Sequence, residues 1–245
     1  MNILSKFFYW CRLIRHPPVL VYQMGKVGSY SVYMALKKSY PGVVLHFHEL
    51  SIHERWELAF LYKLIKRGTI RPRVVNLTRE PISRNLSAFF YRLEKYFPEA
   101  LRDDYFDVSK LQKAFIEKYP HDLPLNWYDM QLKQVFDIEI LKEDFGDEGC
   151  AVYNYSNCEV LVMRMELDDE KKGELLGPFA EIENLKVERL NKIRDDKLKK
   201  PYQEFKKQIV LPENIINRLC DSEYFMHFYS NKFVEETRSE WLNRI

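Results

Sequence analysis

The chain has 245 residues, 46% of them hydrophobic and 30% charged, which is ordinary for a globular protein. With 38 Lys and Arg against 36 Asp and Glu, the net charge is only +2, so no nucleic-acid partner is expected. This length fits one large α/β domain with enough buried surface to fold without a structural metal or disulfides.

Residues 1–18 are predicted to form an amphipathic leader that ends at Pro17-Pro18. Met1–His16 mixes aromatic with basic residues. The segment is too short and too charged to span a bilayer, and it lacks the cleavage pattern of a signal peptide. Two interpretations stay open: a helix in peripheral contact with a membrane surface, and a helix packed on the body of the protein.

Residues 19–245 are predicted to form a single domain. Its first half alternates apolar runs, typical of buried strands, with helical stretches. The strands are expected at Val19–Gln23, Val43–Phe47 and Arg73–Leu77, and the helices up to about Ser39, at Glu54–Arg67 and from Pro81 onward. This alternation favours a three-layer α/β sandwich with a central parallel sheet.

The second half of the chain is less regular and shows no repeat or clear domain boundary. Two strands joined by a turn are predicted at Ala151–Tyr155 and Glu159–Met163. Helices are predicted at Lys110–Tyr119, Asn126–Phe136, Asp169–Phe179, Tyr202–Ile209, Pro212–Cys220 and Ser230–Leu242.

The turn between the first strand and its helix is rich in groups that bind anions. Its sequence runs from Gln23 through Met-Gly-Lys26-Val-Gly28-Ser29-Tyr30 to Ser31. Glycines let the backbone approach a phosphate, the helix start presents N–H groups, and the serines and Lys26 add donors and charge. The turn is not a Walker A loop, because Leu20 and Val27 stand where that motif requires Gly and Ser or Thr.

A second segment, Arg79-Glu-Pro81-Ile-Ser83-Arg84-Asn-Leu-Ser87, follows the third strand. Arg79 stands at the carboxyl end of that strand, where α/β sheets commonly bind ligands. Ser83, Arg84 and Ser87 are spaced so that they can share one helix face, which predicts a second phosphate site beside Arg79. Taken singly, the arginine is more typical of a helix cap and the serine of a helix surface.

Together, the two segments resemble the family of sulfotransferases that depend on 3′-phosphoadenosine 5′-phosphosulfate (PAPS). The resemblance implies a P-loop-like sulfotransferase fold and PAPS as donor substrate, without a metal. It assigns the 5′-phosphosulfate to Lys26, Gly28, Ser29 and Ser31, with Tyr30 in the same loop, and the 3′-phosphate to Arg79 and Ser87. Glu80 replaces the more usual Asp of the family, at a position expected to cap the helix rather than contact phosphate.

The second strand ends in His46-Phe-His48-Glu49. Two histidines at i and i+2 on a strand point the same way, but no third ligand at a recognisable spacing supports a zinc site. The pair resembles that of uronosyl sulfotransferases, which implies His48 as general base, with His46 or Glu49 in support. A structural histidine beneath the loop is the competing interpretation, and so is His46 as the base.

Three later segments resemble bacterial capsular polysaccharide synthesis proteins. They lie around Asn126-Trp127-Tyr128, Val160–Leu167 and Tyr224–Ser230. The combined resemblance implies transfer of a sulfuryl group from PAPS to a carbohydrate or small-molecule hydroxyl, with Lys26 stabilising the leaving phosphate. Two alternatives stay open: a small-molecule kinase, and a non-catalytic nucleotide-binding protein of polysaccharide assembly.

The four cysteines show no CxxC and no zinc-finger spacing. Free thiols in a reducing compartment are therefore expected, which predicts a cytoplasmic protein, at the membrane periphery if the leader binds lipid.

Overall fold

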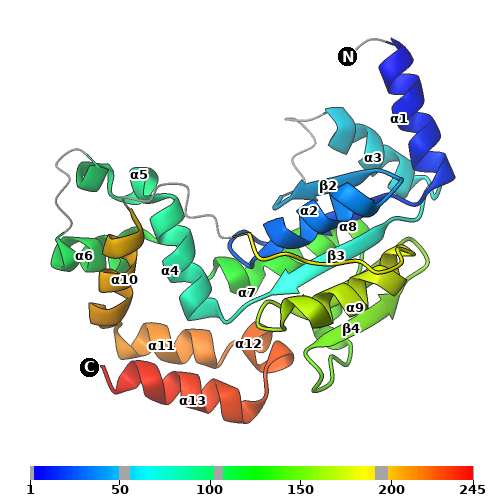
Figure 1. Cartoon of the computed structure of the whole chain (residues 1–245). Helices are drawn as coiled ribbons and strands as arrows, with labels where there is room; N and C mark the ends of the chain where they lie inside the picture. The colour runs from blue at the N-terminus through cyan, green and yellow to red at the C-terminus, as the bar shows by residue number, and fades with distance from the viewer. Residues whose placement is uncertain (1–2, 50–55, 102–106, 191–197, 245) are drawn as a thin grey trace. The chain divides into compact units, whose positions relative to one another are not determined.

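The computed structural model describes residues 3–49, 56–101, 107–190 and 198–244 (Figure 1). The chain forms two compact units, each built from two separate stretches. Unit 1 comprises Met1–Thr78 and Tyr128–Leu190, and unit 2 comprises Arg79–Trp127 and Asn191–Ile245. This division does not test whether residues 19–245 fold as a single domain, so that expectation stays a prediction.

Unit 1 contains a five-stranded sheet with the strand order β2-β1-β3-β5-β4. The strands are β1 (Val19–Tyr22), β2 (Val44–Phe47), β3 (Arg73–Thr78), β4 (Cys150–Asn154) and β5 (Glu159–Arg164). β2, β1, β3 and β5 run parallel, which confirms the predicted parallel sheet for these four strands. For β4 the prediction of a parallel sheet is wrong: β4 pairs antiparallel with β5, because the turn between them is too short for the crossover that a parallel pair needs.

Helices cover both faces of the sheet. On one face α2 (Ser29–Ser39) packs against β1 and β2. On the other face the hydroxyl of Tyr22 donates to Oε1 of Gln131 at 2.6 Å, and its ring contacts Phe136. Gln131 belongs to a π-helix (Tyr128–Lys133) that continues into α8 (Gln134–Phe136), so the predicted helix over this stretch is confirmed with a change of winding.

Two further helices of unit 1 confirm sequence predictions. α1 (Ile3–Arg15) is the helix predicted in the leader. α3 (Trp56–Lys66) matches the predicted second helix, whose expected start at Glu54 lies outside the described residues.

α9 (Asp169–Ala180) packs closely against the chain that follows it. A Cβ added at Gly173 would lie 2.5 Å from the carbonyl oxygen of Leu185, so a larger residue there would push this chain off the helix. Figure 1 shows α2 and α9 in front of the sheet.

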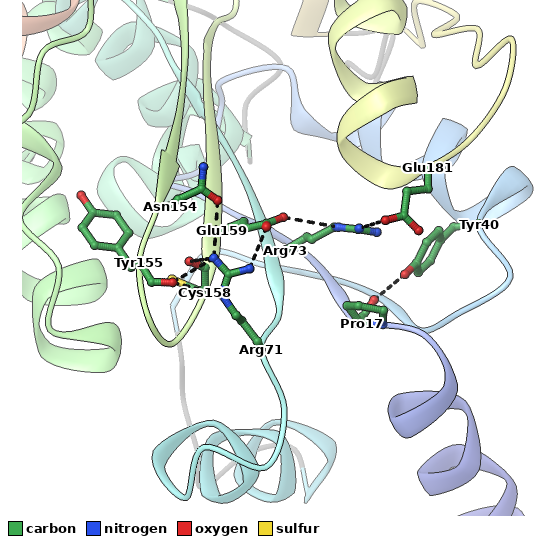
Figure 2. A network of polar contacts seen from close by, with 9 residues as sticks. All are labelled: Pro17, Tyr40, Arg71, Arg73, Asn154, Tyr155, Cys158, Glu159 and Glu181. Atoms are coloured by element: carbon green, nitrogen blue, oxygen red, sulfur yellow. Dashed lines mark hydrogen bonds and ion pairs between the residues drawn. The ribbon is translucent and has the colours of Figure 1, made fainter.

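An ion-pair network lies at the edge where the parallel strands begin (Figure 2). Arg71 contacts Glu159 at 2.7 Å, and Arg73 lies between Glu159 and Glu181. Tyr40 donates a hydrogen bond to the carbonyl of Pro17 at 2.5 Å. The charges at this edge therefore neutralise one another within the protein.

Unit 2 is built from helices around an aromatic core, and it includes short helices that the sequence pattern did not predict, at Leu93–Tyr96, Pro98–Leu101 and Glu223–Phe228. Phe89, Phe115, Phe205 and Tyr119 are buried and contact one another in this core. The elements are α4 (Pro81–Tyr91), α5 (Leu93–Tyr96), η1 (Pro98–Leu101), α6 (Val108–Lys118), α7 (Leu123–Trp127), α10 (Lys199–Gln208), α11 (Glu213–Cys220), α12 (Glu223–Phe228) and α13 (Asn231–Leu242). No helix in the described part of the chain is long and apolar enough to cross a membrane.

Candidate functional site

The loop after β1 has a backbone that few residues adopt. Lys26 and Gly28 both lie in the left-handed region, with φ of 72° and 75°. A Cβ added at Gly28 would lie 3.0 Å from Cγ of Met165, the residue that follows β5. The loop therefore requires glycine at position 28, whereas Lys26 holds an unfavourable conformation that an ordinary side chain avoids at a cost of about 1–2 kcal/mol.

Helix α2 begins directly after this loop and has no side-chain cap. Gly28 is its N-cap residue and offers no acceptor to the first-turn N–H groups. Such a helix start carries partial positive charge and can receive an anion. Ser29 is buried, while Lys26, Tyr30 and Ser31 are half-buried.

His46 lies on β2 beneath the start of α2. Its Nε2 is 2.9 Å from Oγ of Ser29, and its ring stacks on Tyr33 with centroids 5.1 Å apart. Burial, with a smaller effect from the neighbouring His48, lowers the pKa of His46 from 6.5 to about 4. His46 is therefore neutral at pH 7 and can exchange a hydrogen bond with the Ser29 hydroxyl without adding charge.

His48 follows β2 and lies against the loop. Its ring carbons and Nε2 lie 3.6–3.9 Å from the position of a Cβ at Gly25. Its Nδ1 is 3.0 Å from the carbonyl oxygen of Gln23. Because a carbonyl only accepts hydrogen bonds, the tautomer with a proton on Nδ1 makes this contact and carries its lone pair on Nε2, whereas the longer contact of Nδ1 with Nε2 of Gln23, at 3.5 Å, suits the other tautomer. The side chain is exposed, as a base that meets a substrate must be.

Asn76 supports the end of β1 from the middle of β3, a role that the sequence predictions did not include. Its side-chain amide donates to the carbonyl of Tyr22 at 2.8 Å and accepts from the hydroxyl of Tyr128 at 2.6 Å. All three residues are buried. Tyr22 is the last residue of β1, so these bonds fix the point where the loop leaves the sheet.

The other two predicted loop residues have partners within unit 1. Oγ of Ser31 accepts a hydrogen bond from the backbone N–H of Leu190 at 2.9 Å, which leaves its hydroxyl proton able to donate elsewhere. The ring of Tyr30 lies near Tyr33 and His46, with centroids 6.1 and 6.5 Å away. The structure thus brings the predicted residues of unit 1 together at one edge of the sheet.

Arg79 and Ser87 lie in unit 2. The backbone of Arg79 is held at both polar groups by the buried Tyr224, whose hydroxyl accepts from its N–H at 3.1 Å and donates to its carbonyl at 2.8 Å. Ser87 is half-buried on α4. Tyr224 lies 145 residues from Arg79 in the sequence, too far for any local pattern to indicate the contact.

The start of α4 is capped by the side chain of its N-cap residue. Glu80 caps the helix and accepts hydrogen bonds from the N–H groups of Ile82 and Ser83, which confirms its predicted role as a cap. Burial raises the pKa of Glu80. The predicted shared face needs a correction, because Arg84 is buried and donates to Tyr119 and Asn85 at 2.9 and 3.0 Å. Burial lowers the pKa of Arg84.

Trp127 and Tyr128 are buried, at 4% and 2% exposure, and serve packing within their units rather than stacking on a ligand at the surface. Among the described residues no three His, Cys, Asp or Glu side chains are grouped as metal ligands would be. The four cysteines, Cys11, Cys150, Cys158 and Cys220, are free thiols.

The sequence profile of one family, described as "Putative capsular polysaccharide synthesis protein", matches residues 104–230, just over half of the chain. The chain belongs to this family. No curated protein and no solved structure matches it. The predicted resemblance to capsular polysaccharide synthesis proteins is confirmed, while the likeness to sulfotransferases stays a prediction.

The matched span of the chain includes Tyr128 and Tyr224, which support the two predicted ligand segments. It begins after Lys26, His48 and Arg79. Family membership therefore supports the scaffold around the site, and the chemistry of the site must be argued from its geometry.

Proposed function

We propose that this protein is a sulfotransferase that moves a sulfuryl group from PAPS to a hydroxyl of a carbohydrate or related acceptor. The observation that carries the proposal is the pairing of an uncapped helix start at Gly28 with a histidine whose Nε2 is the basic atom. An anion receptor and a positioned base are the two groups that such a transfer needs.

The loop would bind the 5′-phosphosulfate of the donor. The first-turn N–H groups of α2 and the hydroxyl of Ser29 are suited to phosphate oxygens, and Lys26 supplies positive charge at the same turn. As the bond between sulfur and the bridging oxygen breaks, negative charge grows on the leaving phosphate. Lys26 would stabilise that charge, and the strained backbone at this residue is consistent with selection for position rather than stability.

His48 would act on the acceptor. The acceptor oxygen forms a bond to sulfur, its proton passes to Nε2 of His48, and 3′-phosphoadenosine 5′-phosphate leaves with the electrons of the broken S–O bond. The contact of Nδ1 with the Gln23 carbonyl keeps the ring in the tautomer that can accept this proton.

His46 would position Ser29 rather than touch the acceptor. With a proton on Nε2, the neutral ring donates to Oγ of Ser29 at 2.9 Å, and the hydroxyl proton of Ser29 is then directed to the bound anion. The low pKa of His46 keeps it from competing with His48 for the acceptor proton at neutral pH.

The 3′-phosphate is assigned to Arg79 and Ser87 on the sequence resemblance alone. Glu80 already occupies the N–H groups of Ile82 and Ser83, so the Arg79 side chain and the Ser87 hydroxyl would have to make these contacts. Membership of a capsular polysaccharide synthesis family supports a glycan as the acceptor.

The proposal is tested by incubating the protein with sulfur-labelled PAPS and bacterial polysaccharide and measuring label in the glycan. We expect transfer that His48→Asn abolishes, because Asn keeps a donor for the Gln23 carbonyl but cannot take a proton. The variant should still gain thermal stability from 3′-phosphoadenosine 5′-phosphate, and AMP should stabilise either protein much less.

Two results would overturn the proposal. Turnover of magnesium-ATP without PAPS binding would identify a kinase, and donor binding without transfer to any hydroxyl acceptor would identify a non-catalytic nucleotide-binding protein. Equal stabilisation by the bisphosphate and AMP would remove Arg79 and Ser87 from the donor site.

A further inference from the structure

Helix α1 exposes large apolar side chains to solvent. Trp10 and Ile14 are one helical turn apart, with 41% and 54% of their surface exposed, and Phe8 is 64% exposed. A helix that packs on a globular core normally turns its apolar face inward and its charged face outward. Among residues 8–15 of α1, the part whose side chains the structure describes, only Leu13 is buried, and Phe8, Trp10 and Ile14 are exposed.

The orientation of α1 is fixed by specific bonds. The guanidinium of Arg12 donates to the carbonyls of Gly42 and Pro41 at 2.6 and 3.1 Å. Together with the burial of Leu13, these bonds define the side of the helix that contacts the protein, and the exposed Ile14 lies on the side away from Arg12. In Figure 1, α1 extends away from the strands of unit 1.

The charge of this part of the chain selects the partner. Residues 1–48 contain no Asp or Glu, and the first acidic residue is Glu49. The same stretch carries six basic residues: Lys6, Arg12, Arg15, Lys26, Lys37 and Lys38. Tryptophan and phenylalanine beside basic residues are typical of helices that lie in the headgroup region of a membrane.

We propose that α1 binds the surface of an anionic lipid bilayer, with Trp10 and Ile14 inserted among the headgroups and acyl chains and with Phe8 and Arg15 at the headgroup level beside them. Helix α1 leads into the amino end of β1, and the loop that contains Lys26 and Gly28 follows the carboxyl end of the same strand. The inference is independent of the proposed function and needs no sulfuryl transfer.

The test is flotation of the purified full chain with vesicles. Vesicles of phosphatidylcholine with about one third phosphatidylglycerol should carry the protein, and pure phosphatidylcholine vesicles should bind it at least severalfold more weakly. High salt should reduce binding to the anionic vesicles. The emission of Trp10 should shift to shorter wavelength on binding, and Trp10→Phe should lose that shift.

Substitution separates this surface from general stickiness. The triple variant Phe8→Ser, Trp10→Ser and Ile14→Ser should bind roughly a hundredfold more weakly. The matched control, Met130→Ser with Val152→Ser, removes exposed apolar side chains elsewhere in unit 1 and should bind like the unchanged protein. Arg15→Gln should weaken binding about fivefold on anionic vesicles only.

Arg12 is left intact in every variant, because its bonds to Pro41 and Gly42 hold the helix. Unchanged thermal melting would show that the triple variant folds. Failure of the unchanged protein to float would overturn the proposal. So would a dimer in lipid-free solution that the triple variant abolishes, since the face would then be an interface between two copies.

Discussion

Helices α2 and α4 have the same length, eleven residues, and each follows a parallel strand, but their first turns are satisfied in opposite ways. Glu80 closes the start of α4 by accepting from the N–H groups of Ile82 and Ser83. Gly28 stands at the start of α2 and provides no acceptor. A turn between a strand and a helix is therefore not a ligand site by itself. Of the two helices, α2 is the one whose first-turn N–H groups are not capped by a side chain and can bind an anion.

The surroundings of the two turns follow the same division. Around α2, Lys26 and Gly28 hold left-handed backbone, His46 lies on the neighbouring strand β2, and His48 follows that strand. Around α4, the buried Arg84 is bonded to Tyr119 and Asn85, and the backbone of Arg79 is held by Tyr224. The turn before α2 has a strained backbone and polar side chains near solvent, whereas the polar groups of the turn before α4 bond to other parts of the protein.

The largest effect is expected from Lys26→Gly. Glycine relieves the left-handed strain, so the free energy of unfolding should rise by about 0.5–1 kcal/mol. The rate of sulfuryl transfer should nevertheless fall by roughly a hundredfold or more, because a charge on the leaving phosphate loses its partner. Chemical denaturation and the transfer assay measure the two effects on the same sample.

Asp137→Gly is the matched control for this prediction. Asp137 has φ of 59° in the same unit, at the end of α8, so glycine should stabilise the protein there without changing the rate of transfer. A Lys26→Gly protein that is more stable and fully active would show that the lysine has no catalytic role.

A second, smaller effect concerns His46 and pH. Its pKa is lower in the folded protein, about 4, than the 6.5 of an unfolded chain, so the unfolded chain binds more protons between these values. The free energy of unfolding should therefore fall as the pH drops through this window, by on the order of 3 kcal/mol when complete. His46→Gln should show a shallower loss, measured by denaturation at pH 7 and near pH 4. Parallel curves for the two proteins would contradict the buried neutral state.

The third prediction adds a negative charge to the open helix start. Gly28→Asp places a carboxylate at the start of α2, on left-handed backbone and with its Cβ 3.0 Å from Cγ of Met165, so the free energy of unfolding should fall by about 1–2 kcal/mol. The affinity for 3′-phosphoadenosine 5′-phosphate should fall at least tenfold, because the carboxylate repels the anion. Calorimetric titration measures the affinity. Gly28→Ala, which strains the turn without adding a charge, separates the two effects.

Local patterns in the sequence were sufficient for the elements that carry the candidate site. The apolar runs predicted β1, β2 and β3, and the resemblance of the segment after β3 to sulfotransferases implied that Glu80 caps the following helix. The loop residues were found because a turn between a buried strand and a helix must place them at one edge of the sheet.

The contacts that hold the site depend on which sides of the elements pack, and no local pattern contains that information. The spacing of Ser83, Arg84 and Ser87 is compatible with one shared face, but Tyr119 and Asn85 draw Arg84 into the interior. Asn76 and Tyr224 act through partners at least 50 residues away in the sequence. Polar residues in an apolar strand, such as Asn76, were the signal that could have identified this support.

The smallest effect is expected from opening the closed turn. Glu80→Ala removes both hydrogen bonds to the start of α4 and should lower the free energy of unfolding by about 1–2 kcal/mol, the usual value of an N-cap. Glu80→Gln keeps an acceptor oxygen and avoids a buried charge, so it should cost less than the alanine variant. If Glu80 only caps the helix, neither variant should change the affinity for AMP. The ligand contacts assigned to unit 2 come from Arg79 and Ser87, and they recognise a 3′-phosphate that AMP lacks. Loss of AMP binding in the glutamine variant, with stability intact, would instead place Glu80 in contact with the nucleotide and make the two turns functionally alike.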